Sequence, residues 1–158
     1  SGCIPITLKK HLPHATISSI DVSENAIKVA KKNAELNNVD INFMQQDILK
    51  TTALHQKFDL IVSNPPYVRE LEKEEIKNNV LENEPHLALF VEDHNPLLFY
   101  DKIADLAKEF LLENGLLFFE INQYLAKETV ELLEAKGYKN IELRKDLFGN
   151  DRMILAHK

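Results

Sequence analysis

Four consecutive residues, Asn64-Pro65-Pro66-Tyr67, have the types and spacing to act on a planar nitrogen. Each proline fixes its own φ and lacks a backbone N–H, and the residue before each proline is pushed out of helical geometry. The sequence therefore predicts a stiff, extended turn whose carbonyl groups have no neighbouring N–H. The Asn64 side-chain oxygen and the Pro65 carbonyl match the two N–H groups of an NH₂, and Tyr67 can stack on its plane. The structural alternative is a rigid loop with a packed tyrosine.

Two carboxylates, Asp21 and Asp47, are candidates for binding a nucleoside cofactor. A carboxylate between a strand and a helix can accept hydrogen bonds from both hydroxyls of a ribose. Asp21 has this position, although taken alone it is more readily explained as a cap for the helix that is expected near Ser23. Asp47 could accept from the exocyclic amine of an adenine, with Ile48 against the ring, or it could be a solvated turn aspartate.

The elements that must position these residues alternate between strand and helix. Apolar periodicity and helix boundaries indicate the elements. Strands are expected at 15–21, 41–44, 58–63, 116–121, 141–144 and 153–156, and helices at 4–12, 23–36, 95–114 and 125–136. The strand at 58–63 is apolar enough to be buried in a parallel sheet, and residues 68–94 are expected to be loop with some helix.

This alternation predicts an α/β fold, with a doubly wound and mostly parallel sheet. The last two strands flank Gly149 and Asn150 and should form an antiparallel hairpin. Doubly wound sheets bind ligands beyond the carboxyl ends of their strands. The residues directly after each strand are therefore the informative ones, and Asp21, Asp47 and Asn64 all have such positions.

Length and composition describe one ordinary soluble domain. The chain has 158 residues, of which 44% are hydrophobic and 28% charged. No apolar run is long enough for a membrane span and no signal-peptide pattern is present, so a cytoplasmic location is expected. The net charge of −6 argues against a sequence-independent nucleic-acid binder, which needs basic surface.

No metal site or disulfide is expected. Cys3 is the only cysteine, and it is expected to be a small buried residue rather than a nucleophile. The six histidines have no metal-ligand spacing. Glu120 ends an apolar strand and could face the site, although a structural role is an equal alternative.

Several short segments carry a resemblance that covers the whole chain. Asp21, Asp47 and the 63–67 segment, in this order and spacing, resemble class I methyltransferases that act on exocyclic or amide nitrogens. Further segments resemble the HemK/PrmC family of protein-glutamine methyltransferases: Ser1-Gly2-Cys3-Ile4 the tail of its glycine-rich cofactor loop, Asn83-Glu84-Pro85-His86-Leu87-Ala88-Leu89 its Glu-Pro segment, and Lys145-Asp146-Leu147 with Gly149-Asn150-Asp151-Arg152 its closing turn.

The resemblance implies methylation, with S-adenosylmethionine as donor, of the glutamine in the Gly-Gly-Gln motif of peptide-chain release factors. The site residues then follow by role. Catalysis is assigned to Asn64, Pro65 and Tyr67, cofactor binding to Gly2, Asp21, Asp47, Ile48 and Asn64, and substrate binding to Asn64, Pro65, Pro66, Tyr67 and Glu84.

The family also has features that are expected to precede Ser1. These are a helical N-terminal domain that helps to recognise the release factor, and a strand with an acidic-Gly-x-Gly loop. The chain is thus interpreted as a partial catalytic domain. The preceding strand is expected between the strands that end at Asp21 and Ser63. Without it, these 158 residues are expected to bind S-adenosylmethionine weakly or not at all, and to be unstable or to associate through open strand edges.

Two other functions remain open from the sequence. An adenine methyltransferase acting on DNA or RNA would use the same turn, with the base flipped against Tyr67. The acidic balance and the Glu84-Pro85 segment count against it. The other alternative is a catalytically silent module that keeps the fold. The sequence does not indicate an oligomeric state.

Overall fold

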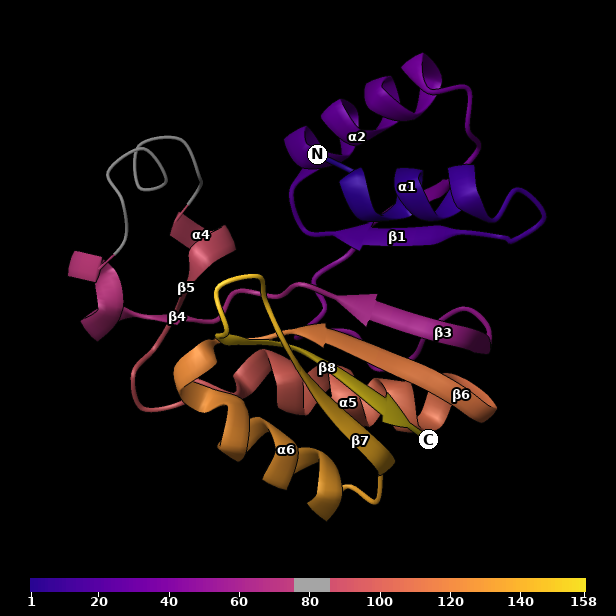
Figure 1. Cartoon of the computed structure of the whole chain (residues 1–158). Coiled ribbons are helices and arrows are strands. Elements are labelled where there is room, and N and C mark those ends of the chain that lie inside the picture. Colours follow the sequence, from indigo (N-terminus) through magenta and orange to yellow (C-terminus); the bar gives the residue numbers. More distant parts are fainter. Residues whose placement is uncertain (76–85) are drawn as a thin grey trace. The chain divides into compact units, whose positions relative to one another are not determined.

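The computed structural model describes residues 1–75 and 86–158, which form two compact units, Ser1–Thr51 and Thr52–Lys158 (Figure 1). Among the described helices, none has the length and apolar character to cross a membrane.

The first unit contains two helices and a pair of parallel strands. Its elements are α1 (Cys3–His11), β1 (Ser18–Asp21), α2 (Glu24–Leu36) and β2 (Asn42–Gln45), and β1 pairs in parallel with β2. Helix α2 begins where the sequence predicts, because the Ser23 side chain accepts a hydrogen bond from the Ala26 N–H at 3.2 Å. Its apolar stripe is buried at Ile27, Ala30 and Ala34.

Gly2 occupies a position at the start of α1 that a side chain would strain. Its φ is +75°, and an added Cβ would lie 2.9 Å from the Ala30 Cβ. We expect Gly2→Ala to lower the free energy of unfolding by about 2–4 kcal/mol, combining left-handed strain and overpacking. Urea denaturation checks this value. Gly149→Ala is the matched control, since Gly149 has φ +87° and nothing within 4 Å of an added Cβ. Equal losses in the two variants would exclude the packing contribution.

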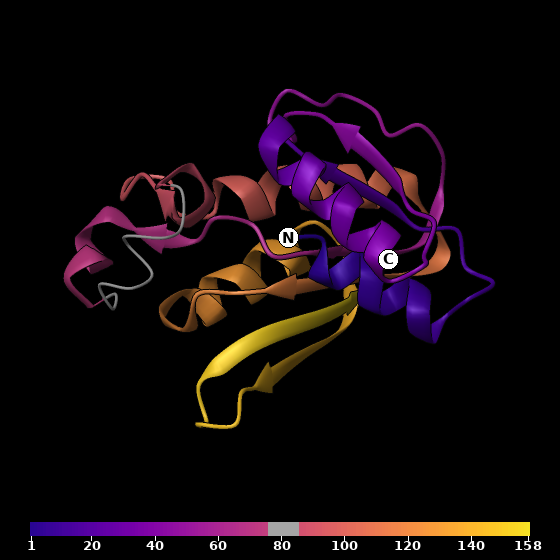
Figure 2. The same ribbon diagram turned by 90° about the horizontal axis from the view of Figure 1, so that it is seen from above.

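The second unit is built on a four-stranded sheet. The strands are β3 (Phe58–Ser63), β6 (Leu111–Glu120), β7 (Lys139–Lys145) and β8 (Asp151–His157), in the order β3-β6-β8-β7. Strand β3 is parallel to β6, whereas β8 is antiparallel to both β6 and β7. The expected C-terminal hairpin is confirmed, and Figure 2 shows it as a twisted ribbon.

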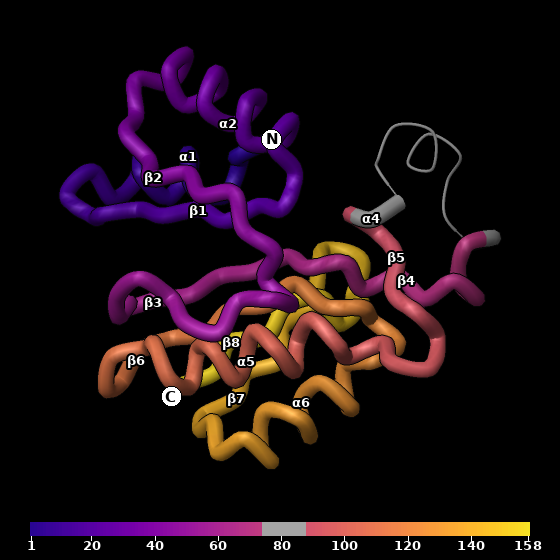
Figure 3. The backbone as a smooth tube through the Cα atoms, turned by 180° about the vertical axis from the view of Figure 1, so that it is seen from behind, coloured from indigo at the N-terminus to yellow at the C-terminus, as the bar shows by residue number. Residues whose placement is uncertain are grey.

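Three helical segments accompany this sheet: α5 (Leu98–Phe110), the 3-10 helix η2 (Gln123–Leu125) and α6 (Ala126–Ala135). Helices α5 and α6 lie next to each other beside the sheet (Figure 3). The fully buried side chains of the unit include Tyr100, Leu117, Phe119, Ile121 and Leu133. The centre of the sheet at β6 is therefore firmly packed.

The segment between β3 and α5 contains short elements. Val68–Arg69 forms β4, Glu70–Glu75 a 3-10 helix η1, His86–Leu89 helix α4 and Phe90–Val91 strand β5. Strands β4 and β5 pair in parallel, a pairing that the sequence analysis missed. The expectation of loop with some helix is otherwise met by the described part of 68–94.

The boundary between α5 and β6 differs from the prediction. The helix was expected to run from Asn95 to Gly115, but it begins at Leu98 and ends at Phe110. Leu111 pairs with Phe58 and Leu116 with Leu60, so residues 112–115 form a bulge in β6. Asn114 has φ 65°, and a Cβ on Gly115 would lie 2.9 Å from the Leu111 Cβ. Gly115 therefore permits a close approach within the bulge and does not end a helix.

Strand β3 is less buried than its composition suggested. Leu60 and Val62 are 37% and 38% exposed. Within residues 1–75 and 86–158, β3 pairs with β6 and β1 with β2, so each has one unpaired edge in this structure. The expected strand between β1 and β3 stays a prediction.

Candidate functional site

Both candidate cofactor carboxylates follow the carboxyl edge of the β1–β2 pair. Asp21 is opposite Gln45 in the parallel register, and the Gln46 N–H donates to the Asp21 carbonyl at 3.0 Å. Asp47 follows directly. This is the edge at which parallel sheets of this class bind ligands.

Asp21 has one carboxylate oxygen engaged and one available. Its Oδ1 accepts the Ser23 N–H at 2.8 Å, whereas the N-cap of α2 is Ser23 itself. Its Oδ2 accepts no hydrogen bond from the residues that the structure describes, and the residue is exposed. Asp21 thus stabilises the turn before α2 without capping the helix, and it retains an acceptor for a hydroxyl group.

Asp47 is more fully engaged within its own turn. Its Oδ1 accepts the Leu49 N–H at 3.0 Å and its Oδ2 lies 3.1 Å from the Lys50 Nζ. The hydrogen bond from Lys50 is the main cause of the lowered pKa of this carboxyl group. An adenine amine would have to share this carboxylate with Lys50. Ile48 is half-buried beside it.

The 64–67 turn begins directly after β3. Asn64 is exposed, Pro65 is buried, and Pro66 and Tyr67 are half-buried. The Asn64 side-chain oxygen and the Pro65 carbonyl accept no hydrogen bond from the described part of the chain. Both oxygens therefore lack a hydrogen-bond donor among the described residues.

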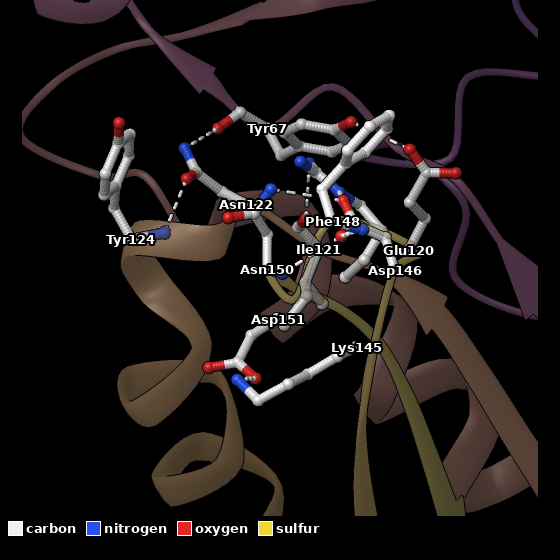
Figure 4. Close-up of polar contacts among 11 residues, drawn as sticks. Tyr67, Glu120, Ile121, Asn122, Tyr124, Lys145, Asp146, Phe148, Asn150 and Asp151 are labelled. Carbon is white, nitrogen blue, oxygen red and sulfur yellow. Dashed lines mark hydrogen bonds and ion pairs between the residues drawn. The ribbon is translucent and has the colours of Figure 1, made fainter.

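Tyr67 is fixed at both its hydroxyl and its main chain, as Figure 4 shows. Its hydroxyl donates to the Glu120 Oε1 at 2.8 Å, and its carbonyl accepts from the Asn122 Nδ2 at 3.0 Å. Burial, and then the negative charge of Glu120, raises the pKa of Tyr67 to about 12. The side chain is thus a neutral phenol near neutral pH. Glu120 contacts the turn through the Tyr67 hydroxyl, which fits both of its sequence interpretations.

A buried polar cluster lies behind the turn. Glu72 is only 6% exposed, and its carboxylate accepts from the Arg69 N–H at 3.1 Å, the Arg69 Nε at 2.9 Å and the Asn122 Nδ2 at 2.7 Å. The sequence analysis missed Arg69, Glu72 and Asn122. Asn122 follows β6 by two residues, so a systematic search beyond every strand end would have included it.

The closing turn between β7 and β8 packs next to this cluster. The Asp146 Oδ1 accepts the N–H groups of Phe148 and Asn150, at 2.8 and 3.0 Å, and these bonds keep its pKa below the usual range, with Asn150 contributing most. The Ile121 N–H donates to the Arg152 carbonyl at 2.9 Å. The segment that carried part of the resemblance is therefore joined to the residue between Glu120 and Asn122 (Figure 4).

The remaining predicted residues have separate outcomes. Glu84 lies outside the described residues. Cys3 is exposed, so its predicted burial is wrong; it begins α1 at the surface.

The requirement for glycine at Gly2 is explained by its φ and its approach to Ala30, and its predicted cofactor contact stays a prediction. Among residues 1–75 and 86–158 there is no group of three His, Cys, Asp or Glu side chains that could hold a metal.

Comparison with known proteins finds curated relatives that match nearly the whole chain. The curated release factor glutamine methyltransferase of Flavobacterium psychrophilum is 64% identical over 98% of this chain and 54% of its own length. The protein of the same name from Bacteroides thetaiotaomicron is 44% identical over 100% of this chain and 57% of its own length. The chain thus spans about half the length of these relatives. The resemblance found in the sequence is confirmed.

A solved structure of a methyltransferase from Pyrococcus furiosus superposes with a TM-score of 0.73, at 18% identity, covering 100% of this chain and 70% of that one. This likeness confirms the predicted α/β fold class. The sequence model of the methyltransferase small domain matches residues 1–88 of the 158. The chain therefore belongs to the methyltransferase small domain family.

Proposed function

We propose that this chain is the catalytic part of an enzyme that transfers a methyl group from S-adenosylmethionine to the side-chain amide nitrogen of a glutamine. The glutamine is the one in the Gly-Gly-Gln motif of peptide-chain release factors. The observation that carries the proposal is the pair of open acceptors at Asn64 and Pro65 beside the fixed ring of Tyr67. The names of the curated relatives support the choice of substrate.

The two acceptors address the main chemical difficulty of the reaction. An amide nitrogen is a poor nucleophile, because its lone pair is delocalised into the carbonyl. Acceptance of both N–H bonds, by the Asn64 oxygen and the Pro65 carbonyl, would raise the electron density on nitrogen and fix its direction. Orientation of this kind can contribute on the order of 7–11 kcal/mol in the best cases.

The same acceptors stabilise the charge that develops. When the nitrogen forms its bond to the methyl carbon, the bond from that carbon to the donor sulfur would break, and its electron pair would stay on the sulfur as a neutral thioether. The nitrogen becomes positively charged, and a carbonyl and an amide oxygen nearby would lower the energy of that state. The extra proton then leaves to water, so a general base is not needed before the attack. Tyr67 contributes a planar face, and its neutral phenol remains bound to Glu120.

The first unit has residues that fit the methyl donor in part. S-adenosylmethionine, when bound, would supply an electrophilic methyl group on a sulfonium centre. The open Oδ2 of Asp21 fits a ribose hydroxyl, and the half-buried Ile48 fits the face of a base. Asp47 fits less well, because Lys50 and the Leu49 N–H already occupy its carboxylate.

A substrate comparison tests the proposal. The full-length protein is incubated with methyl-labelled S-adenosylmethionine and either a release factor or adenine-containing oligonucleotides. We expect label in the release factor only. Label in the oligonucleotides alone would favour the adenine methyltransferase. A calorimetric titration with the cofactor, run in parallel, identifies a silent module as a protein that binds no cofactor and labels neither substrate.

A further inference from the structure

The side chain of Asn122 is buried, and both its amide nitrogen and its amide oxygen form hydrogen bonds. It is only 4% exposed. Its Nδ2 donates to the Tyr67 carbonyl at 3.0 Å and to the Glu72 Oε2 at 2.7 Å, while its Oδ1 accepts the Tyr124 N–H at 2.9 Å. An asparagine amide has two N–H donors. Both are therefore directed at the segment that leaves the 64–67 turn.

Among the described residues, few other groups bond to the 64–67 turn itself; Arg152 also interacts with the Tyr67 hydroxyl. Pro65 and Pro66 have no N–H to donate, and the hydroxyl of Tyr67 is held by Glu120. Glu120 and Asn122 both lie at the carboxyl end of β6, so one end of a single strand provides both attachments. The chain is also held before the turn by the pairing of Ser63 in β3 and after it by the pairing of Val68 in β4, while the hydroxyl bond holds only the end of the Tyr67 side chain. The second bond, from Asn122 to the Tyr67 carbonyl, fixes the direction in which Asn64 and Pro65 are presented.

The base of these attachments is rigid. Ile121, between Glu120 and Asn122, is fully buried, and its N–H is bonded to the Arg152 carbonyl at 2.9 Å. The Tyr100 hydroxyl donates to the Glu120 carbonyl at 3.1 Å. Strand β6 itself lies between β3 and β8. The main chain around Asn122 is therefore held in place independently of the 64–67 turn, and its side chain can position that turn.

Asn122 also joins the turn to the buried carboxylate of Glu72. That carboxylate is bonded to the main chain and the guanidinium group of Arg69, which forms β4 with Val68. The two N–H groups of Asn122 thus connect positions 67 and 72 directly. Loss of this side chain would leave the Tyr67 carbonyl without its partner and remove one donor from a buried charge, which is costly.

We propose that Asn122 is a positioning residue for methyl transfer: through the Tyr67 carbonyl it sets the placement of the Asn64 oxygen and the Pro65 carbonyl. This inference rests on the proposed function for its kinetic consequence. A displacement of about 1 Å at a reacting group can cost on the order of 10²-fold in rate. Asn122 itself needs no contact with the substrate.

The test compares Asn122→Ala with Thr129→Val. Thr129 is fully buried in α6, and its hydroxyl donates to the Leu125 carbonyl at 2.7 Å without a contact to the turn. Asn122→Ala loses three side-chain hydrogen bonds and Thr129→Val one, so both are assayed below their measured unfolding temperatures. We expect Asn122→Ala to lower kcat by about 10–100-fold, with little change in the KM for the release factor or in cofactor affinity. Thr129→Val should keep the parental kcat.

A second measurement does not depend on activity. Hydrogen exchange, followed by mass spectrometry, should be faster in the 64–72 peptide of Asn122→Ala and unchanged there in Thr129→Val. With an active parent protein, a kcat for Asn122→Ala within about twofold of the parent, or an equal loss in both variants, would overturn the inference. A parent that does not methylate a release factor would refute the proposed function instead. The exchange of the 64–72 peptide would then decide the inference, and an unchanged rate would overturn it.

Discussion

Replacing Asn64 with alanine should lower kcat by about 10²–10³-fold, which is the usual cost of removing one well-placed polar group from an enzyme site. The affinity for S-adenosylmethionine should change little. Asn64 is exposed at the end of β3, and its side-chain oxygen accepts no bond from the described residues. The substitution therefore removes an acceptor for the substrate without breaking a contact of the fold. Steady-state kinetics with a release factor and calorimetry with the cofactor measure the two quantities.

Asn25→Ala serves as the control for this prediction. Asn25 is also exposed, in the first turn of α2, so the variant makes the same chemical change away from the turn. It should retain the parental kcat. If Asn64→Ala stays within about threefold of the parent, Asn64 has no part in catalysis.

Replacing Asp21 with alanine should act mainly on the cofactor. We expect its affinity to fall by about 10–100-fold, the equivalent of roughly 1.5–3 kcal/mol for a hydrogen bond to a charged group. The value of kcat at saturating cofactor should change much less, because a ribose contact acts alike in the ground and transition states. Calorimetric titration of the full-length protein and saturation kinetics give the two effects separately.

Two further variants separate the role of Asp21 in cofactor binding from its role in stabilising the turn before α2. Asp21→Asn keeps a side-chain oxygen for the Ser23 N–H, which Asp21 accepts at 2.8 Å, but it loses the charge and the second acceptor. Asp21→Asn should therefore retain the stability of the parent, but it should bind the cofactor more weakly than the parent, as Asp21→Ala does. Asp40→Ala changes an exposed aspartate at the amino side of β2 and should have no effect. Unchanged affinity in Asp21→Ala would leave Asp21 as a turn residue only.

Local patterns predicted the elements whose boundaries depend on local chemistry. Ser23 capped α2 as expected, and the Gly149–Asn150 pair lies in the turn of the predicted hairpin. The start of β6 could not be found in this way. Leu111 becomes a strand residue because it pairs with Phe58, which is distant in the sequence, and the bulge before Leu116 depends on that pairing.

In the site, too, residues with a local sequence signal were predicted, whereas residues that depend on long-range contacts were not. Asn64 and Tyr67 were found because a double proline after a strand is an unusual local signal. Glu72 and Asn122 are ordinary residues in the sequence, and their importance comes from a bond of 2.7 Å across 50 positions. Asn122 reaches the Tyr67 carbonyl across 55 positions. A pattern in one segment does not contain such a contact, so the bonds of Asn122 to positions 67 and 72 became visible only in the structure.

The most direct test of the account is to locate the transferred methyl group in the product. A release factor is incubated with the full-length protein and S-adenosylmethionine, digested, and analysed by tandem mass spectrometry. The account predicts one methyl group on the side-chain nitrogen of the glutamine in the Gly-Gly-Gln peptide, and about 10²–10³-fold slower appearance of this product with Asn64→Ala. A methyl group on another residue, or an unmodified glutamine in a preparation that binds the cofactor, would contradict it.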